Sequence, residues 1–257
     1  MRRVGTVSLV GAGPGDPDLM TLRAVRCMQR AGVVVYDRLI DPRTLDHAPP
    51  RAERIFVGKA AGQVSMTQRD IERVLIDRAL DGHNVVRLKG GDPFLFGRGG
   101  EEVEALAAAG IPYEVVPGIS SALAVPAAAG IPVTHRRLAS SLTVITGHED
   151  PEKFESTIDW AWAARAPGTL VILMGLERVW SICRRLEEEG RSADTPAAAI
   201  SAGTLPQQRS VYTSLSALPE AVREAGLRSP AIIVVGEVAR FPQTIAASEL
   251  LSLAEAV

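Results

Sequence analysis

The sequence predicts an α/β protein made of two α/β domains, and three observations support this prediction. Short apolar runs of strand length alternate with amphipathic stretches of helix length from residue 6 to residue 235. Turns that contain glycine follow several of the apolar runs. A polar link near residues 131–141 interrupts the alternation, and a second series of elements then begins. We therefore expect one domain at residues 1–134 and another at residues 135–257.

The first half has the pattern of a doubly wound sheet, because its continuous apolar runs are typical of strands buried on both faces of a parallel sheet. Strands are expected at residues 6–10, 33–35, 55–57, 85–88 and 113–116, and helices at residues 18–32, 67–82, 101–109 and 120–130. Asp18 is expected to cap the first helix. Thr67 and Asp70 have the spacing of a capping box at the start of the second.

The second half repeats the alternation with different lengths. Strands are expected at residues 142–146, 170–174, 197–200, 208–213 and 231–235. Helices are expected near residues 154–163 and at residues 177–189 and 215–225, and the tail at residues 245–257 has the pattern of an amphipathic helix.

Composition and charge give no indication of a nucleic-acid or membrane partner, although a near-zero net charge is compatible with a local basic patch. The chain has 257 residues, of which 46% are hydrophobic and 23% charged, as in ordinary globular proteins. Its formal net charge of −2 indicates no basic field for nucleic acid. No run approaches the roughly 20 apolar residues that cross a membrane, and none after Arg2-Arg3 resembles a signal sequence. Cys27 and Cys183 lie in helical patterns as isolated thiols, so a cytoplasmic location is expected.

Four loops follow strands of the predicted first sheet, at residues 11–16, 37–38, 58–59 and 90–96. Because doubly wound sheets bind ligands outside the carboxyl ends of their strands, we expect these loops to converge on one edge. The loop at residues 90–96 is the most informative. Gly90 and Gly91 let a ligand approach the backbone, Asp92 offers a carboxylate, and the apolar residues 94–96 are typical of a pocket lining.

The first turn invites a competing interpretation as a dinucleotide-binding loop. Gly11 and Gly13 fit the pattern G-x-G-x-x-G, but Asp16 replaces the third glycine and Pro14 lacks the N–H that a pyrophosphate would need. These two residues disfavour a phosphate site. Asp37, at the end of the second strand, mimics the ribose-binding acid of that fold, so the alternative stays open.

No metal site is expected. The four histidines, His47, His83, His135 and His148, show no metal-ligand spacing with one another or with the cysteines. No G-x-S-x-G motif is present, and Ser120 and Ser121 are most simply helix caps or polar residues of a pocket.

Taken in order, the segments resemble the tetrapyrrole methylases that use S-adenosylmethionine, and the resemblance spans nearly the whole chain. The matching segments are Val10–Asp16, Tyr36–Leu39, Val57–Lys59, Arg87–Glu102, Pro117–Ser120, Gly130–His135, Thr146–His148 and Ser229–Ala231. The resemblance implies two α/β domains of the tetrapyrrole methylase type, with the ligand cleft between them. The oxidase–chelatase half fused to some relatives is not expected.

The resemblance also implies roles for individual residues. Asp37 matches a proton acceptor and Lys59 a proton donor. The residues that match contacts to S-adenosylmethionine are Pro14, Gly90, Gly91, Asp92, Leu95, Ser120, Ser121, Met174 and Gly203. This chain departs from the family pattern at Leu95, usually isoleucine, at Ser120 and Ser121, usually threonine and alanine, and at Ala60, often arginine.

The activity implied is the transfer of methyl groups from S-adenosylmethionine to C2 and C7 of uroporphyrinogen III. The products are S-adenosylhomocysteine and precorrin-2, formed via precorrin-1, for sirohaem or cobalamin biosynthesis. The acceptor carries eight carboxylates, for which Arg38, Arg98, His135, Arg136 and Arg137 are candidate partners, together with Lys59. A homodimer is implied as well. Two other functions stay open: methylation of a later corrin intermediate, and a non-enzymatic nucleotide-binding module.

Overall fold

The computed structural model describes residues 4–58, 66–148 and 158–246. The chain divides into two compact units, Met1–Ser121 and Ala122–Val257, and each is described by itself. The sequence pattern placed the boundary after residue 134, at the polar link. The structure places it earlier, in front of the small-residue segment 122–130, because that segment packs within the second unit as described below.

The first unit is built on a five-stranded sheet in which all strand pairs are parallel, as the sequence predicted. The strand order is β3-β2-β4-β1-β5. The strands are β1 (Val7–Gly11), β2 (Val33–Tyr36), β3 (Glu53–Phe56), β4 (Val85–Lys89) and β5 (Tyr113–Val116). Three of the four residues of β2 are buried, and so are all five of β4, whereas the edge strand β3 is mostly exposed.

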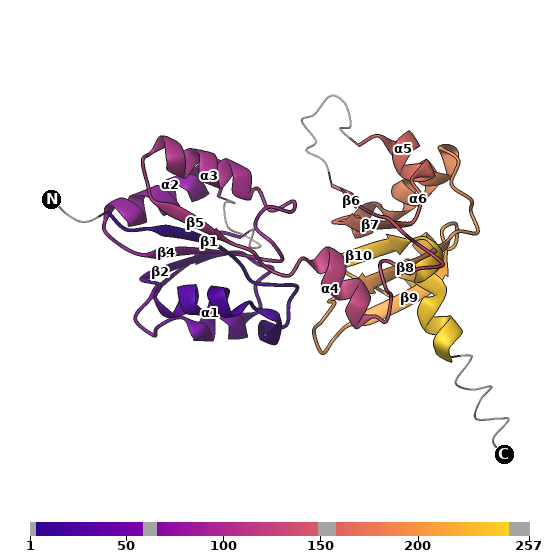
Figure 1. The fold of residues 1–257 in the computed structure, drawn as a ribbon, viewed down its shortest axis with the longest axis horizontal. Coiled ribbons are helices and arrows are strands. Elements are labelled where there is room, and N and C mark those ends of the chain that lie inside the picture. The colour runs from indigo at the N-terminus through magenta and orange to yellow at the C-terminus, as the bar shows by residue number, and fades with distance from the viewer. Residues whose placement is uncertain (1–3, 59–65, 149–157, 247–257) are drawn as a thin grey trace, which may run out of the picture. The chain divides into compact units, whose positions relative to one another are not determined.

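Helices cover both faces of this sheet. Helix α1 (Leu22–Gln29) lies on one face, and α2 (Gln68–Leu80) and α3 (Gly99–Ala108) lie on the other, as Figure 1 shows. Two 3₁₀ helices, η1 (Pro17–Leu19) and η2 (Pro42–His47), complete the unit. Leu75 of α2 and Leu106 of α3 pack in one apolar cluster with Val35, whereas Met28 of α1 packs in a separate cluster.

The caps of these helices differ in one case from the prediction. Thr21, and not Asp18, caps α1, because the chain forms η1 first and Asp16 caps that shorter helix. The capping box of α2 is confirmed: the Thr67 hydroxyl accepts from the Asp70 N–H at 3.2 Å, and the Asp70 carboxylate accepts from the Thr67 N–H at 2.9 Å.

The second unit is built on a mixed sheet with the order β6-β7-β10-β8-β9. The strands are β6 (Leu142–Thr146), β7 (Thr169–Leu173), β8 (Pro196–Ser201), β9 (Arg209–Ser214) and β10 (Ala231–Val235). Only β6 and β7 pair in parallel; β10 is antiparallel to both β7 and β8, and β9 is antiparallel to β8. The predicted strands are all present, with the reversals that the pattern of apolar runs cannot show.

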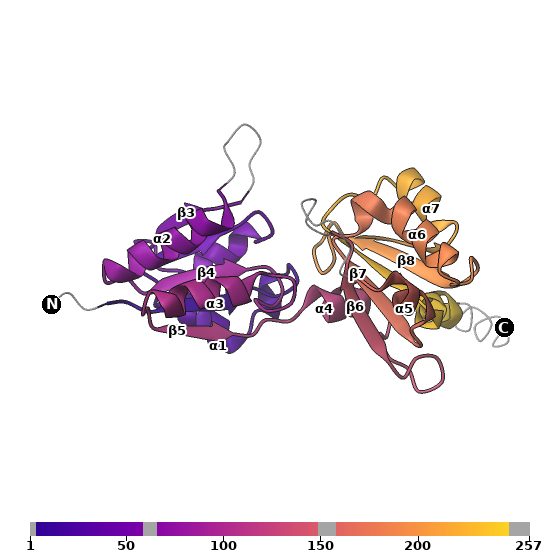
Figure 2. The ribbon, with the colours of Figure 1, turned by 90° about the horizontal axis from the view of Figure 1, so that it is seen from above.

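The described helices of this unit include α4 (Ser121–Ala128), α5 (Trp160–Arg165), α6 (Val179–Glu188) and α7 (Leu218–Glu224), the 3₁₀ helices η3 (Leu176–Arg178) and η4 (Glu237–Arg240), and a helical segment at residues 241–246. Apolar residues of α5, α6 and α7 form one core cluster with the sheet, and Figure 2 shows α6 and α7 side by side. Parts of two predicted helices, near residues 154–163 and at 245–257, lie outside the described residues.

Helix α4 belongs to this second unit through three contacts. The space beside Gly203 is filled by Val125, because a Cβ on that glycine would stand 2.3 Å from the valine Cγ1. The Tyr212 hydroxyl donates to the Ala129 carbonyl at 2.9 Å, and the Gln208 amide donates to the Ala128 carbonyl at 3.3 Å. Across residues 4–58, 66–148 and 158–246, no helix is long and apolar enough to cross a membrane.

Candidate functional site

The carboxyl edge of the parallel sheet brings the predicted glycine loops into direct contact. Gly91 donates its N–H to the Gly13 carbonyl at 2.7 Å, and Gly13 donates back to Gly91 at 3.3 Å. A Cβ on Gly11 would stand 2.5 Å from the Gly118 Cα, so only glycine permits this approach of two backbones. The loops after β1 and β4, two of the four predicted to converge, therefore meet, and the turn after β5, which was not among the four, joins them.

The same contacts weigh against a dinucleotide site. The N–H groups of Ala12 and Gly13 already donate to the carbonyls of Lys89 and Gly91. The chain then enters η1 at Pro17, and α1 begins only at Leu22. A pyrophosphate loop instead leads directly into a helix whose free N–H groups bind the phosphates. The structure lacks that arrangement at this turn.

Asp92 ties two of the converging loops together. Its Oδ1 accepts from the Phe94 N–H at 2.8 Å, and its Oδ2 accepts from the Gly118 N–H at 3.1 Å. An ionised carboxylate has about four acceptor positions, so each oxygen keeps capacity for another donor. Ser120 and Ser121 lie beside this loop, since a Cβ on Gly91 would be 3.9 Å from the Ser120 Cα and 3.8 Å from the Ser121 nitrogen.

The two glycines predicted to lie at the ligand, Gly90 and Gly91, differ in their surroundings. The φ of Gly91, +66°, favours glycine, although a Cβ there would meet only ordinary contacts. Gly90 is more enclosed, because its Cβ would stand 3.3 Å from the Leu39 Cβ. Pro14, in the loop after β1, and Leu95, in the loop after β4, are both half-buried. The apolar residues 94–96 were predicted to line a pocket, but Phe94 is 59% exposed within its unit.

Asp37 lies at the same level of the sheet, because Tyr36 pairs with Leu88 in the register of β2 and β4. Its Oδ1 accepts from the Leu39 N–H at 3.0 Å, and its Oδ2 lies 3.4 Å from the Arg87 Nη2. The carboxylate side chain is 26% exposed. Asp37 is therefore oriented by two donors and still reached by solvent.

Arg87, Lys89 and Glu102 form a buried cluster to which the sequence reasoning assigned no role. Glu102 accepts from the Arg87 Nε at 3.0 Å and from the Lys89 Nζ at 2.9 Å, and all three side chains are at most 5% exposed. Burial, together with the charge of Arg87, lowers the pKa of Lys89 from its ordinary value, although Glu102 opposes the shift. The sequence did contain a signal for this cluster: Arg87 and Lys89 interrupt an apolar run that is otherwise typical of a buried strand, so both cations needed a buried partner.

The basic residues predicted to bind the acceptor fall in both units. Arg38 and Arg98 are exposed in the first, and Arg98 pairs with Glu101 at 3.3 Å. In the second unit the His135 ring packs against Phe241, with centroids 5.5 Å apart. Arg136 and Arg137 are exposed beside it. Lys59, the predicted proton donor, lies outside the described residues.

In the second unit, left-handed residues mark the ends of two strands. Met174 follows β7 with a φ of +56°, and Ala202 and Thr204 follow β8 with φ values of +49° and +68°. Because β7 and β8 are both antiparallel to β10, these ends share one edge. Strained non-glycine residues concentrate at binding sites. Gly203 lies between two of these residues, and glycine is also needed there for packing, because a side chain at this position would collide with Val125.

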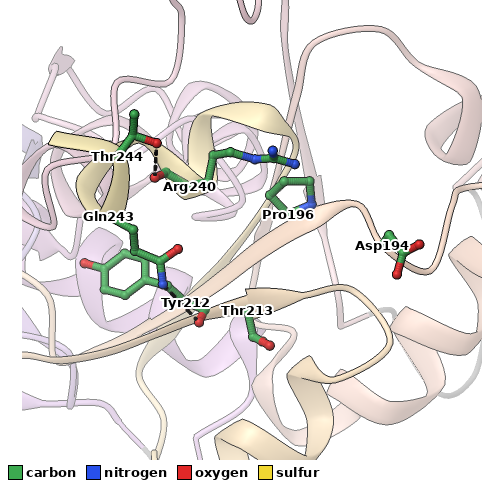
Figure 3. A pocket seen from close by; sticks show the side chains of 7 residues that line it. All are labelled: Asp194, Pro196, Tyr212, Thr213, Arg240, Gln243 and Thr244. Carbon is green, nitrogen blue, oxygen red and sulfur yellow. Dashed lines mark hydrogen bonds between the residues drawn. The ribbon is translucent and has the colours of Figure 1, made fainter. Parts of the chain in front are cut away.

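A separate cavity in the second unit contains none of the predicted residues. It is lined by Asp194, Pro196, Tyr212, Thr213, Arg240, Gln243 and Thr244 (Figure 3). Within the described ranges no group of three or more histidine, cysteine, aspartate or glutamate side chains is placed to hold a metal ion. The predicted lack of a metal stays a prediction, as does the cleft between the domains.

The fold and the edge geometry together define a class of protein. It is an α/β protein in which glycine loops meet at the carboxyl edge of a parallel sheet, the edge where sheets of this kind bind ligands, and in which a second, mixed α/β unit follows. The sequence profile of the tetrapyrrole (corrin/porphyrin) methylases matches residues 6–219. The chain belongs to this family, which confirms the resemblance seen in the sequence.

Individual relatives agree with this assignment. A protein of Methanosarcina barkeri named S-adenosyl-L-methionine-dependent uroporphyrinogen III methyltransferase is 52% identical over 91% of this chain and 92% of its own length. The crystal structure of the native form of uroporphyrin III C-methyl transferase from Thermus thermophilus superposes with a TM-score of 0.79, at 43% identity, covering 92% of this chain and all of that one. The two-domain α/β prediction is thereby confirmed.

Other relatives differ in length or in name. The siroheme synthase of Azotobacter vinelandii is 49% identical over 95% of this chain, but the chain spans only 52% of that protein. The cobalt precorrin-4 methyltransferase structure superposes with a TM-score of 0.81 at 28% identity, covering 91% of this chain and 95% of that one. The superposition alone therefore does not separate members of the family.

Proposed function

We propose that this chain is an S-adenosylmethionine-dependent C-methyltransferase that methylates C2 and C7 of uroporphyrinogen III, giving precorrin-2 via precorrin-1. The observation that carries the proposal is the 52% identity, over nine-tenths of both chains, to a protein named for this activity. The product would enter sirohaem or cobalamin biosynthesis. A cytoplasmic homodimer is part of the proposal and rests on the family resemblance; light scattering after gel filtration tests the dimer.

The residues at the carboxyl edge of the first sheet fit the methyl donor. Gly91 has no side chain to block the approach of a ligand to its backbone, and Asp92 keeps acceptor positions for the donor's ammonium group. Pro14, Leu95, Ser120 and Ser121 would contact the same molecule. Met174 and Gly203 of the second unit are proposed to contact its adenine. Bound S-adenosylmethionine would supply an electrophilic methyl group on a sulfonium.

The chain's own residues would align the reactants and manage one proton. Methyl transfer to a carbon nucleophile depends chiefly on orientation, because the leaving thioether is neutral. After methylation a proton must leave a bridging carbon, and Asp37 is the proposed acceptor, with its two oxygens already oriented by Leu39 and Arg87. Lys59 is the proposed donor. Arg38, Arg98, His135, Arg136 and Arg137 are proposed to bind the acceptor's carboxylates.

The two other functions receive less support. A methylase of a later corrin intermediate has the same fold, but the identity to such an enzyme is 28%, against 52% and 43% for the two proteins named for uroporphyrin-type substrates. A non-enzymatic nucleotide-binding module would give no reason for a solvent-reached carboxylate held by a buried arginine.

The activity is tested by incubating the protein anaerobically with uroporphyrinogen III and methyl-labelled S-adenosylmethionine. We expect a product carrying two labelled methyl groups, with a singly methylated intermediate at early times. A reaction with a later corrin intermediate, run in parallel, should incorporate no label. Label transfer only to the later intermediate, or no transfer at all, would contradict the proposal.

The role of Asp92 is tested by calorimetry with S-adenosylhomocysteine. Asp92→Asn keeps one acceptor oxygen but loses the charge that would pair with the ligand's ammonium, so we expect binding to weaken by about tenfold or more. Because Asp92 also ties two loops, thermal unfolding of the variant is measured alongside. Unchanged affinity in a folded variant would exclude the anchoring role.

A further inference from the structure

We propose that Arg87 is a positioning residue for proton removal, acting through Asp37 and held in place by Glu102. The inference rests on the proposed role of Asp37 as proton acceptor. It starts from the buried cluster between β4 and α3, which connects without a break to the carboxylate at the end of β2.

The charges in this cluster balance only if Asp37 is counted. Arg87 and Lys89 are two buried cations, and Glu102, which is fully buried, is a single anion between them. The second anion is Asp37, 3.4 Å from the Arg87 Nη2. The order of charges is therefore Lys89, Glu102, Arg87 and Asp37, alternating in sign from the interior to the exposed edge. A buried cation needs such partners because desolvation is otherwise costly.

The guanidinium of Arg87 is held on three sides. Its Nε donates to Glu102 at 3.0 Å, and its Nη1 donates to the carbonyls of Leu88 at 3.1 Å and Val35 at 3.4 Å. These acceptors come from α3, β4 and β2, three regular elements of one unit. A planar group with this many fixed partners cannot rotate, so its Nη2 is directed at Asp37.

Asp37 in turn receives one donor on each oxygen. The Leu39 N–H fixes Oδ1 from the chain itself, and Arg87 fixes Oδ2 from the neighbouring strand. The remaining lone pairs are available at the exposed side of the carboxylate. A proton acceptor held in this way keeps its orientation at the moment of transfer, and loss of Arg87 would release one of its two anchors.

The test is a double-mutant cycle on turnover. Arg87→Met and Asp37→Asn are measured singly and together, with kcat and KM for both substrates determined for each protein. We expect Arg87→Met to lower kcat by about tenfold or more, while both KM values stay within about twofold. In the Asp37→Asn background, the same change at Arg87 should lower kcat by less than about twofold, because the carboxylate that Arg87 orients is already absent.

Two further variants separate positioning from folding. Arg78→Met removes a surface arginine that pairs with Glu53 through two contacts of 2.9 Å, and it should leave kcat unchanged. If Arg87→Met does not fold, Arg87→Lys replaces it in the cycle, since it keeps the charge but loses the planar fork. We expect Arg87→Lys to retain more turnover than Arg87→Met where both fold.

The outcomes distinguish the positioning role of Arg87 from the proton-acceptor role of Asp37. An equal loss of kcat from the Arg87 change in both backgrounds would overturn the positioning role, even if Asp37 proves essential. A rise in KM with kcat unchanged would overturn it too, because Arg87 would then serve binding. Full turnover of Asp37→Asn would instead refute the proposed function of Asp37, on which the inference rests.

Discussion

The two units bury different kinds of side chain at comparable sheets. Among the described residues, the buried charged side chains are Arg87, Lys89 and Glu102, and all belong to the parallel first unit. In the mixed second unit the buried polar residues are Thr169 and Ser201, which carry no charge. Buried charge is therefore concentrated in the first unit, whereas the second unit is marked by left-handed residues at its strand ends.

Topology decides which strand ends of each unit share an edge. In the first unit all five strands run in one direction, so the loops that follow them meet at one edge. In the second unit the antiparallel strand β10 lies between β7 and β8, so only part of the strand ends share an edge. There the strained residues Met174, Ala202 and Thr204 gather. Three changes test this comparison.

The largest effect is expected from Glu102→Gln. The change leaves Arg87 and Lys89 buried without their shared anion, which should lower the free energy of unfolding by about 3 kcal/mol. Urea unfolding measures it. The matched control in the second unit is Glu188→Gln, which breaks an exposed pair with Arg184 and should change stability very little. Equal effects of the two changes would mean that the buried cluster is not distinctive.

A smaller effect is expected from Gly203→Ala in the second unit. The new methyl would stand 2.3 Å from the stiff Val125 side chain, so stability should fall by about 2 kcal/mol. Adding Val125→Ala opens the space, and the alanine at position 203 should then cost less than it does beside valine. Gly100→Ala is the control in the first unit, where no atom lies within 4 Å, and it should not destabilise. A loss of the same size in both Val125 backgrounds would contradict the packing explanation.

The smallest expected difference between the units is in the rate at which their two cysteine thiols are labelled. Burial raises the pKa of Cys183 to about 12, so its reactive thiolate is nearly absent at pH 8. Burial and Glu114 also raise the pKa of the half-buried Cys27. We expect slow labelling of the native protein by a thiol reagent, with Cys27 reacting before Cys183, and rapid labelling of both in guanidinium chloride. Cys27→Ser identifies which thiol reacts; rapid native labelling of that variant would contradict the burial of Cys183.

Much of the fold followed from local patterns. The apolar runs predicted every strand of both sheets, and the capping box at Thr67 and Asp70 is present with both of its hydrogen bonds. The cap of α1 was wrong, because Asp18 falls inside a 3₁₀ turn, while Thr21 stands at the true helix start. The domain boundary differs too, because helix α4 has little polar surface to mark the unit in which it packs.

The sequence by itself determined the family, through the resemblance of its ordered motifs, and the order of strands and helices along the chain, because apolar period is a local property. It also predicted that the glycine loops after β1 and β4 meet. Only the tertiary structure decided the reversals in the second sheet, the contact between Gly203 and Val125, and the connection from Lys89 through Glu102 and Arg87 to Asp37. These depend on residues far apart in the chain meeting at fixed distances. No local pattern specifies such meetings, since a charge in a buried strand shows that a partner is needed but not which residue provides it.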